Sequence, residues 1–192
     1  MTITEQIKEE LLKRTNASKE KDNFDFWEEH IKYVVKNALD LAETYNADKE
    51  IVELGALLHD IAMPSNIGPR EEHHIHGAKI AEELLTKYGY PKEKIERVKQ
   101  CVLNHRGSKD YPRNTIEEEI IADADVIAHF DSIPALFSLA FTKINLDIKE
   151  GTQYVKNKLA RDYNKLSPRT KEYLKERYQK IIDVLFVDNN DN

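Results

Sequence analysis

The sequence predicts an all-α protein, a single-domain bundle of helices, and three observations support this. Apolar residues recur at the three- and four-residue spacing of amphipathic helices and do not alternate as in strands. Glycine and proline are scarce, with six of each among 192 residues, so the chain has few breakpoints. Residues that favour helix starts, such as Asp48 and Thr115, precede several of the periodic segments.

The first helices are expected on either side of a short break near residue 46. Residues 26–45 place their apolar side chains on one face, which predicts a long amphipathic helix. Asp48 is the expected N-cap of the next helix, which runs to His59 and stops before Pro64, because proline interrupts a helix. Residues 64–70 are therefore expected to form a loop.

Two helices are expected in the middle of the chain. Residues 71–88 restart the helical pattern, and Gly89 stands where a left-handed C-cap is expected. Pro91 opens the following helix, and Gly107 and Pro112 end it in a polar loop.

The remaining helices begin at recognisable caps. Thr115-Ile-Glu-Glu118 matches a capping box, and Ser132-Ile-Pro134 is expected to start another helix. Two more helical patterns follow, one around Leu159 and one after Ser167-Pro168. Their apolar residues are expected to join the core of the chain, with a homodimer face as the alternative.

Charge and cysteine content exclude several function classes. The chain has 29 Lys and Arg against 35 Asp and Glu, a net charge of −6, which argues against binding of nucleic-acid polymers or anionic membranes. No secretory signal is visible at the N-terminus, and the longest apolar run is too short to span a bilayer. The only cysteine, Cys101, rules out an internal disulfide, and a cytoplasmic location is expected.

Several of the seven histidines fall on the apolar side of their expected helices. His30 and His105 follow apolar residues at helical spacing, and Asp125 lies among apolar residues in the same way. A buried carboxylate beside buried imidazoles is costly unless its charge is compensated, and a divalent metal does this while using neutral imidazole as a ligand. Each residue alone fits a hydrogen-bonded core position or an ion pair; the set together predicts a metal site.

The order of these residues resembles a known family. His30, then His59-Asp60, then Asp125 within Ile-Ala-Asp-Ala-Asp-Val-Ile-Ala is similar to the HD superfamily of metal-dependent phosphohydrolases. The resemblance covers about residues 26–142 and implies an all-α bundle of the HD-domain type. It also implies an organisation into an N-terminal helix (1–22), an HD-domain metal-binding core (23–145) and C-terminal helices that pack on this core within the same domain (146–192).

The resemblance implies a ligand set for one or two divalent ions. One ion is expected on His30, His59, Asp60 and Asp125, and Asp60 is expected to bridge to a second. His76 and His105 stand where the extra histidines of two-metal members are expected, with His73 and His74 as second choices for His76. Imidazole and carboxylate ligands without thiolate suit Mn, Fe, Ni, Co or Zn.

Catalysis is assigned to Asp60 and to Arg106, which directly follows His105. Arg70, Arg106 and Lys109 are the expected contacts for substrate phosphate, although most Lys and Arg in a chain that is 33% charged simply face solvent. Metal-bound hydroxide would attack phosphorus at neutral pH. The general acid is unassigned.

The resemblance implies a phosphohydrolase for a small phosphorylated substrate, such as a nucleotide or another phosphate ester or anhydride. The sequence His59-Asp-Ile-Ala-Met63 lacks the lysine typical of members that cleave cyclic dinucleotides, which argues against those substrates. Two alternatives remain open: a mixed-valent di-iron oxygenase of the HD type, and a metal-containing regulatory module without catalysis.

Overall fold

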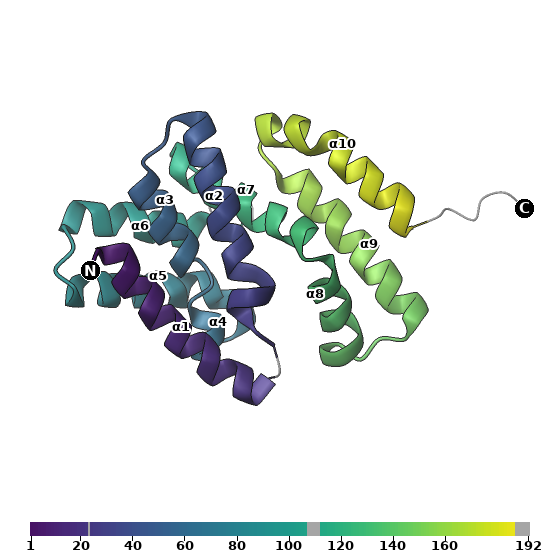
Figure 1. The fold of residues 1–192 in the computed structure, drawn as a ribbon, viewed down its shortest axis with the longest axis horizontal. Helices are drawn as coiled ribbons and strands as arrows, with labels where there is room; N and C mark the ends of the chain where they lie inside the picture. The colour runs from purple at the N-terminus through teal and green to yellow at the C-terminus, as the bar shows by residue number, and fades with distance from the viewer. Residues whose placement is uncertain (23, 107–111, 187–192) are drawn as a thin grey trace, which may run out of the picture. The chain divides into compact units, whose positions relative to one another are not determined.

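The structure is a computed structural model that describes residues 1–22, 24–106 and 112–186 (Figure 1). This part of the chain contains helices and no strand, which confirms the predicted all-α class. The chain forms two compact units, Met1–Ala128 and His129–Asn192, and the division between them falls inside one helix, α7. The division expected from the sequence, into residues 1–22, 23–145 and 146–192, stays a prediction.

The first unit is centred on α3, which packs against α1, α2, α5 and α6. Apolar side chains of α3 and α7, among them Leu54, Leu58 and Ile121, are fully buried and form much of its core. Along the chain its elements are α1 (Ile3–Asp22), η1 (Trp27–Ile31), α2 (Lys32–Tyr45), α3 (Lys49–Leu58), α4 (Ala62–Ser65), η2 (Arg70–Glu72), α5 (His73–Lys87), α6 (Lys92–Asn104) and α7 (Ile116–Asp131).

The helix starts and stops that the sequence predicts are largely confirmed. The Asp48 carboxylate accepts a hydrogen bond from the Ile51 N–H at 3.3 Å, as an N-cap does. Before α7, the Glu118 N–H donates to Thr115 Oγ1 at 3.3 Å, and the Glu118 carboxylate accepts from the Asn114 N–H at 3.0 Å. After α5, Gly89 has the left-handed φ of 70°.

Two local features depart from the predicted pattern. The expected helix 26–45 begins with a π-helical turn, η1, and that turn carries His30. The expected loop 64–70 is wrong in part, because Pro64 lies in the short helix α4 and Arg70 opens the 3-10 turn η2. Proline is tolerated there because the first turn of a helix has no internal partner for its N–H groups.

The second unit contains α8 (Ile133–Ser138), η3 (Leu139–Lys143), α9 (Ile148–Lys165) and α10 (Pro168–Leu185). The Asp147 and Ser167 side chains cap α9 and α10 by accepting the N–H groups of Glu150 and Thr170. The rings of Tyr163 and Tyr178 stack with centroids 4.1 Å apart and join these two helices.

Within the described ranges, no single helix is both long and apolar enough to cross a membrane, and one bent pair, α7 with α8 and η3, meets that test only in combination.

Candidate metal centre

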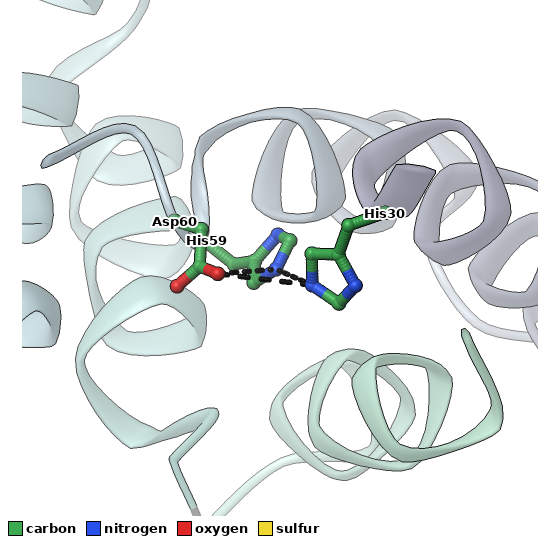
Figure 2. Close-up of side chains that lie close together, drawn as sticks. All are labelled: His30, His59 and Asp60. Atoms are coloured by element: carbon green, nitrogen blue, oxygen red, sulfur yellow. Dashed lines mark hydrogen bonds and ion pairs between the residues drawn. The ribbon is translucent and has the colours of Figure 1, made fainter. Parts of the chain in front are cut away.

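A group of imidazole and carboxylate side chains meets where α3 ends. His59 directly follows the last residue of α3, and its side chain is fully buried. The side chains of His30, His59 and Asp60 point toward one another (Figure 2). The Nε2 atoms of His30 and His59 lie 3.2 Å apart, and Asp60 Oδ2 lies 3.7 Å from the first and 3.6 Å from the second.

Asp125 of α7 completes this first group. Its Oδ1 lies 3.2 Å from His30 Nε2 and 4.0 Å from His59 Nε2. The Nε2 atoms of His30 and His59 therefore each lie within 4.0 Å of one oxygen of Asp60 and one oxygen of Asp125. These are the four residues that the resemblance assigns to the first ion.

The other carboxylate oxygen of Asp60 faces a second group. Asp60 Oδ1 lies 3.2 Å from His73 Nε2 and 3.6 Å from His105 Nε2, and these two nitrogens lie 3.1 Å apart. Asp60 thus presents one oxygen to each group, which is the geometry that a carboxylate bridging two ions requires.

Backbone carbonyls fix the orientation of three of these histidines. The Nδ1–H groups of His59, His73 and His105 each donate to the carbonyl three residues earlier, at Ala56, Arg70 and Val102, over 2.6 to 2.7 Å. Because a carbonyl only accepts, each neutral ring carries its proton on Nδ1 and turns the Nε2 lone pair toward the cluster.

This arrangement fits divalent metal ions. When both rings are neutral with their protons on Nδ1, the Nε2 atoms of His73 and His105 cannot donate to each other, and their lone pairs face each other at 3.1 Å. A cation between them removes that conflict. Carbonyl-oriented imidazoles that turn Nε2 inward are typical of metal-binding histidines.

Electrostatics favour a neutral His59 and an ionised Asp60, whereas burial alone would lower the pKa of His105 but the nearby Asp60 carboxylate raises it above its usual value. Burial lowers the pKa of His59 to about 4, so its imidazole is neutral near neutral pH. Burial alone would raise the pKa of Asp60, but His59, His105 and His73 hold it well below its usual range. Imidazole nitrogens with an ionised carboxylate are the donor set that Mn, Fe, Co, Ni and Zn accept, and binding of the ion displaces a proton from an imidazole that carries one.

The structure brings together five of the six residues predicted as metal ligands and places the sixth, His76, apart from them. His30, His59 and Asp60 form one group, Asp60 and His105 belong to the other, and Asp125 lies beside His30 and His59. His76 Nε2 lies 3.4 Å from Glu72 Oε2, and its ring lies against Gly68. His73, a second choice from the sequence, takes the place expected for His76.

Backbone geometry explains why His73, and not His76, lies in the second group. His73 follows η2 directly, so the Arg70 carbonyl accepts its Nδ1–H and turns its ring into the cluster. The apolar pattern of α5, from which His76 was preferred, cannot reveal a 3-10 turn before the helix. His74 lies in the core, and burial lowers its pKa to about 4.

The cationic residues expected to contact phosphate have different positions. The Arg106 guanidinium donates to the backbone carbonyl of Glu71. The Arg70 side chain is exposed. Lys109 lies outside the described residues.

Comparison with known proteins identifies the family and related folds. A family model described as the HD domain matches residues 27–129. The crystal structure of Bacillus subtilis YpgQ in complex with ADP is similar, with a TM-score of 0.69, 23% identity, and 95% of this chain and 93% of that chain covered. An HD-superfamily hydrolase from Bacillus thuringiensis has a TM-score of 0.65 at 20% identity, with both chains covered completely. At these identities the likeness concerns the fold.

Two curated relatives match over part of their length. An uncharacterised protein of Clostridium beijerinckii is 35% identical over 75 residues, 39% of this chain and 48% of that protein. A tRNA (cytidine(56)-2'-O)-methyltransferase of Picrophilus torridus is 30% identical over 141 residues, 66% of this chain and 38% of that protein. The chain thus spans less than half the length of these relatives.

Proposed function

Because this chain belongs to the HD-domain family, we propose that it is a metal-dependent phosphohydrolase for a nucleotide or another small phosphate ester or anhydride. One observation carries the proposal: the two oxygens of Asp60 face two separate groups of inward-turned histidines. Such a site suits hydrolysis of phosphate compounds, in which two ions hold the attacking water and the phosphoryl oxygens in one geometry.

The residues present fit two divalent ions. His30, His59, Asp60 and Asp125 would hold one ion, and Asp60, His73 and His105 the other. When bound, the ions lower the pKa of coordinated water and neutralise charge that develops on the phosphoryl group. The three-residue second group leaves more coordination positions for water or substrate than the four-residue first group.

In this proposal the protein orients the metal-binding imidazoles and supplies a positive side chain for the substrate phosphate. The carbonyls of Ala56, Arg70 and Val102 hold three imidazoles in the tautomer that binds metal, so no reorganisation is needed during the reaction. The exposed Arg70 side chain, next to the second group in sequence, is our candidate for the phosphate of the substrate. Lys109 is a further candidate on sequence grounds.

A structure of similar fold supports the choice of the first substrates to test. YpgQ from Bacillus subtilis was crystallised with ADP, so nucleoside phosphates are the first substrates to test. We propose a small nucleotide, not a nucleic-acid polymer, because the net charge of −6 opposes binding of a polyanion over a large surface.

Phosphate release tests the proposal. Purified protein is supplied with Mn²⁺, Fe²⁺, Co²⁺, Ni²⁺ or Zn²⁺ and assayed for phosphate or pyrophosphate release from nucleotides and small phosphate esters, beside Asp60→Asn. We expect release that requires metal and falls to the no-enzyme rate in the variant. Metal-loaded protein that releases neither product from any of these substrates would contradict the proposal, and iron-dependent oxygen uptake would then favour an oxygenase.

A further inference from the structure

The short turn η2 lies next to the second histidine group. Each of its three residues contacts a different side chain. The Arg70 carbonyl accepts the Nδ1–H of His73, the Glu71 carbonyl accepts from the Arg106 guanidinium, and the Glu72 carboxylate lies 3.4 Å from His76 Nε2. The turn η2 therefore contacts His73 of the second histidine group and also two residues outside that group, Arg106 and His76.

Arg106 reaches this turn from a different element. It lies two residues beyond the end of α6, directly after His105, whereas η2 precedes α5. Its hydrogen bond to Glu71 thus ties the segment that carries His105 to the turn that orients His73. The guanidinium donates to a backbone carbonyl, and within the described part of the chain no hydrogen bond or ion pair joins it to the histidine groups.

The loop before η2 packs against the His76 side chain at Gly68. Gly68 has a φ of +73°, and a Cβ there would lie 2.1 Å from the His76 ring. The imidazole of His76 therefore occupies the space that a side chain at Gly68 would need. His76 thus contacts the loop before η2 at Gly68 and the last residue of η2 at Glu72, and Arg106 contacts the middle residue, Glu71.

We infer that Arg106 is a positioning residue for the second ion: by holding the Glu71 carbonyl it fixes η2, and through the Arg70 carbonyl it fixes the orientation of His73. This inference rests on the two-ion site proposed above and gives Arg106 a task other than contact with phosphate. His76 supports the same turn.

The inference predicts a selective effect, because the first group does not use η2. His59 is oriented by Ala56 within α3, His30 lies in η1, and Asp125 lies in α7. Loss of Arg106 should therefore weaken the second ion and leave the first unchanged. A general loss of folding would weaken both.

The experiment titrates metal-free protein with Mn²⁺ alone and measures stoichiometry and both dissociation constants by calorimetry and by electron paramagnetic resonance of the unbound ion. The variants are Arg106→Ala, Arg106→Lys and His73→Ala. Arg97→Ala is the matched control, because Arg97 lies in α6 and pairs with Asp48 at 2.8 Å and Glu117 at 3.2 Å, away from η2.

We expect wild type and Arg97→Ala to bind two ions and His73→Ala to bind one. Arg106→Ala should raise the second dissociation constant about 10- to 100-fold, the usual effect of removing an outer hydrogen bond from a metal site, with the first constant unchanged. Arg106→Lys should recover part of the loss, because its ammonium can also donate to the Glu71 carbonyl.

The results separate failure of this inference from failure of the proposed site. Two ions bound normally by Arg106→Ala, or equal weakening of both ions, would overturn the positioning role while leaving the site intact. Wild type that binds a single ion, or His73→Ala that still binds two, would overturn the two-ion site and the inference with it.

Discussion

At the scale of single residues, His73 and His76 lie three residues apart in α5 and have different surroundings. His73 Nε2 faces Asp60 and His105, whereas His76 Nε2 faces the carboxylate of Glu72. A histidine next to a carboxylate at the protein surface forms an ion pair when protonated, but it offers no second donor for a metal. The two residues therefore make a natural pair of comparison variants.

We predict that His73→Gln lowers the number of tightly bound Mn²⁺ ions from two to one. His76→Gln should retain two, because glutamine can still donate to Glu72 and fill the space beside Gly68. Metal analysis after gel filtration measures both. The reverse result, with two ions in His73→Gln and one in His76→Gln, would return the ligand role to His76.

At the scale of elements, α9 is attached to the last turn of α7 through a buried carboxylate. The Asp162 side chain is 2% exposed, and its Oδ2 lies 3.0 Å from His129 Nδ1. Lys158 also donates to Oδ2, and Lys165 Nζ lies 3.6 Å from Oδ1. Burial alone would raise the pKa of Asp162, but His129 and Lys158 hold it below its usual value.

We predict that Asp162→Asn lowers the free energy of unfolding by about 2 kcal/mol at pH 7, because it removes the buried carboxylate that pairs with the partly exposed His129 and Lys158. A lowered folded-state pKa stabilises the protein above the unfolded value, near 4, and this contribution is lost as the pH falls further. The difference between wild type and variant should therefore be constant from pH 7 to 5 and shrink below about pH 4.

Urea unfolding at several pH values measures this difference, with Asp183→Asn as the control. Asp183 is exposed on α10 and accepts a single hydrogen bond from Gln179 at 2.7 Å. Equal stability of wild type and Asp162→Asn at pH 7, or a difference that persists unchanged to pH 3, would refute the buried ion cluster.

Helix starts that depend on residues close together in the sequence were predictable. Turns without such a local pattern were not. Asp48 and the Thr115 to Glu118 box are caps, and each depends on residues three positions apart. The turn η2 is contacted by the side chain of Arg106, which lies beyond the end of α6, and no local residue pattern marks the π-helical turn η1. This is why His30 could be placed on a helix and His73 could not be preferred over His76.

At the scale of the whole molecule, folding assembles the cluster from residues far apart in the chain. His30, Asp60, His105 and Asp125 belong to separate elements and are separated in an unfolded chain. The folded state without metal concentrates two carboxylates and four imidazoles in one place, including two imidazole Nε2 atoms that lie 3.1 Å apart. Ions that bind only the folded state must therefore add to its stability.

We predict that removal of metal with a chelator lowers the melting temperature and that Mn²⁺ restores it. Each ion at 100 times its dissociation constant stabilises by about 2.7 kcal/mol, which corresponds to about 5 to 10 °C for a chain of this size. In Asp60→Asn the shift should largely disappear, because that carboxylate serves both groups. Calorimetric scans over a range of Mn²⁺ concentrations test this. A shift that Asp60→Asn retains in full would mean that the stabilising ions bind elsewhere.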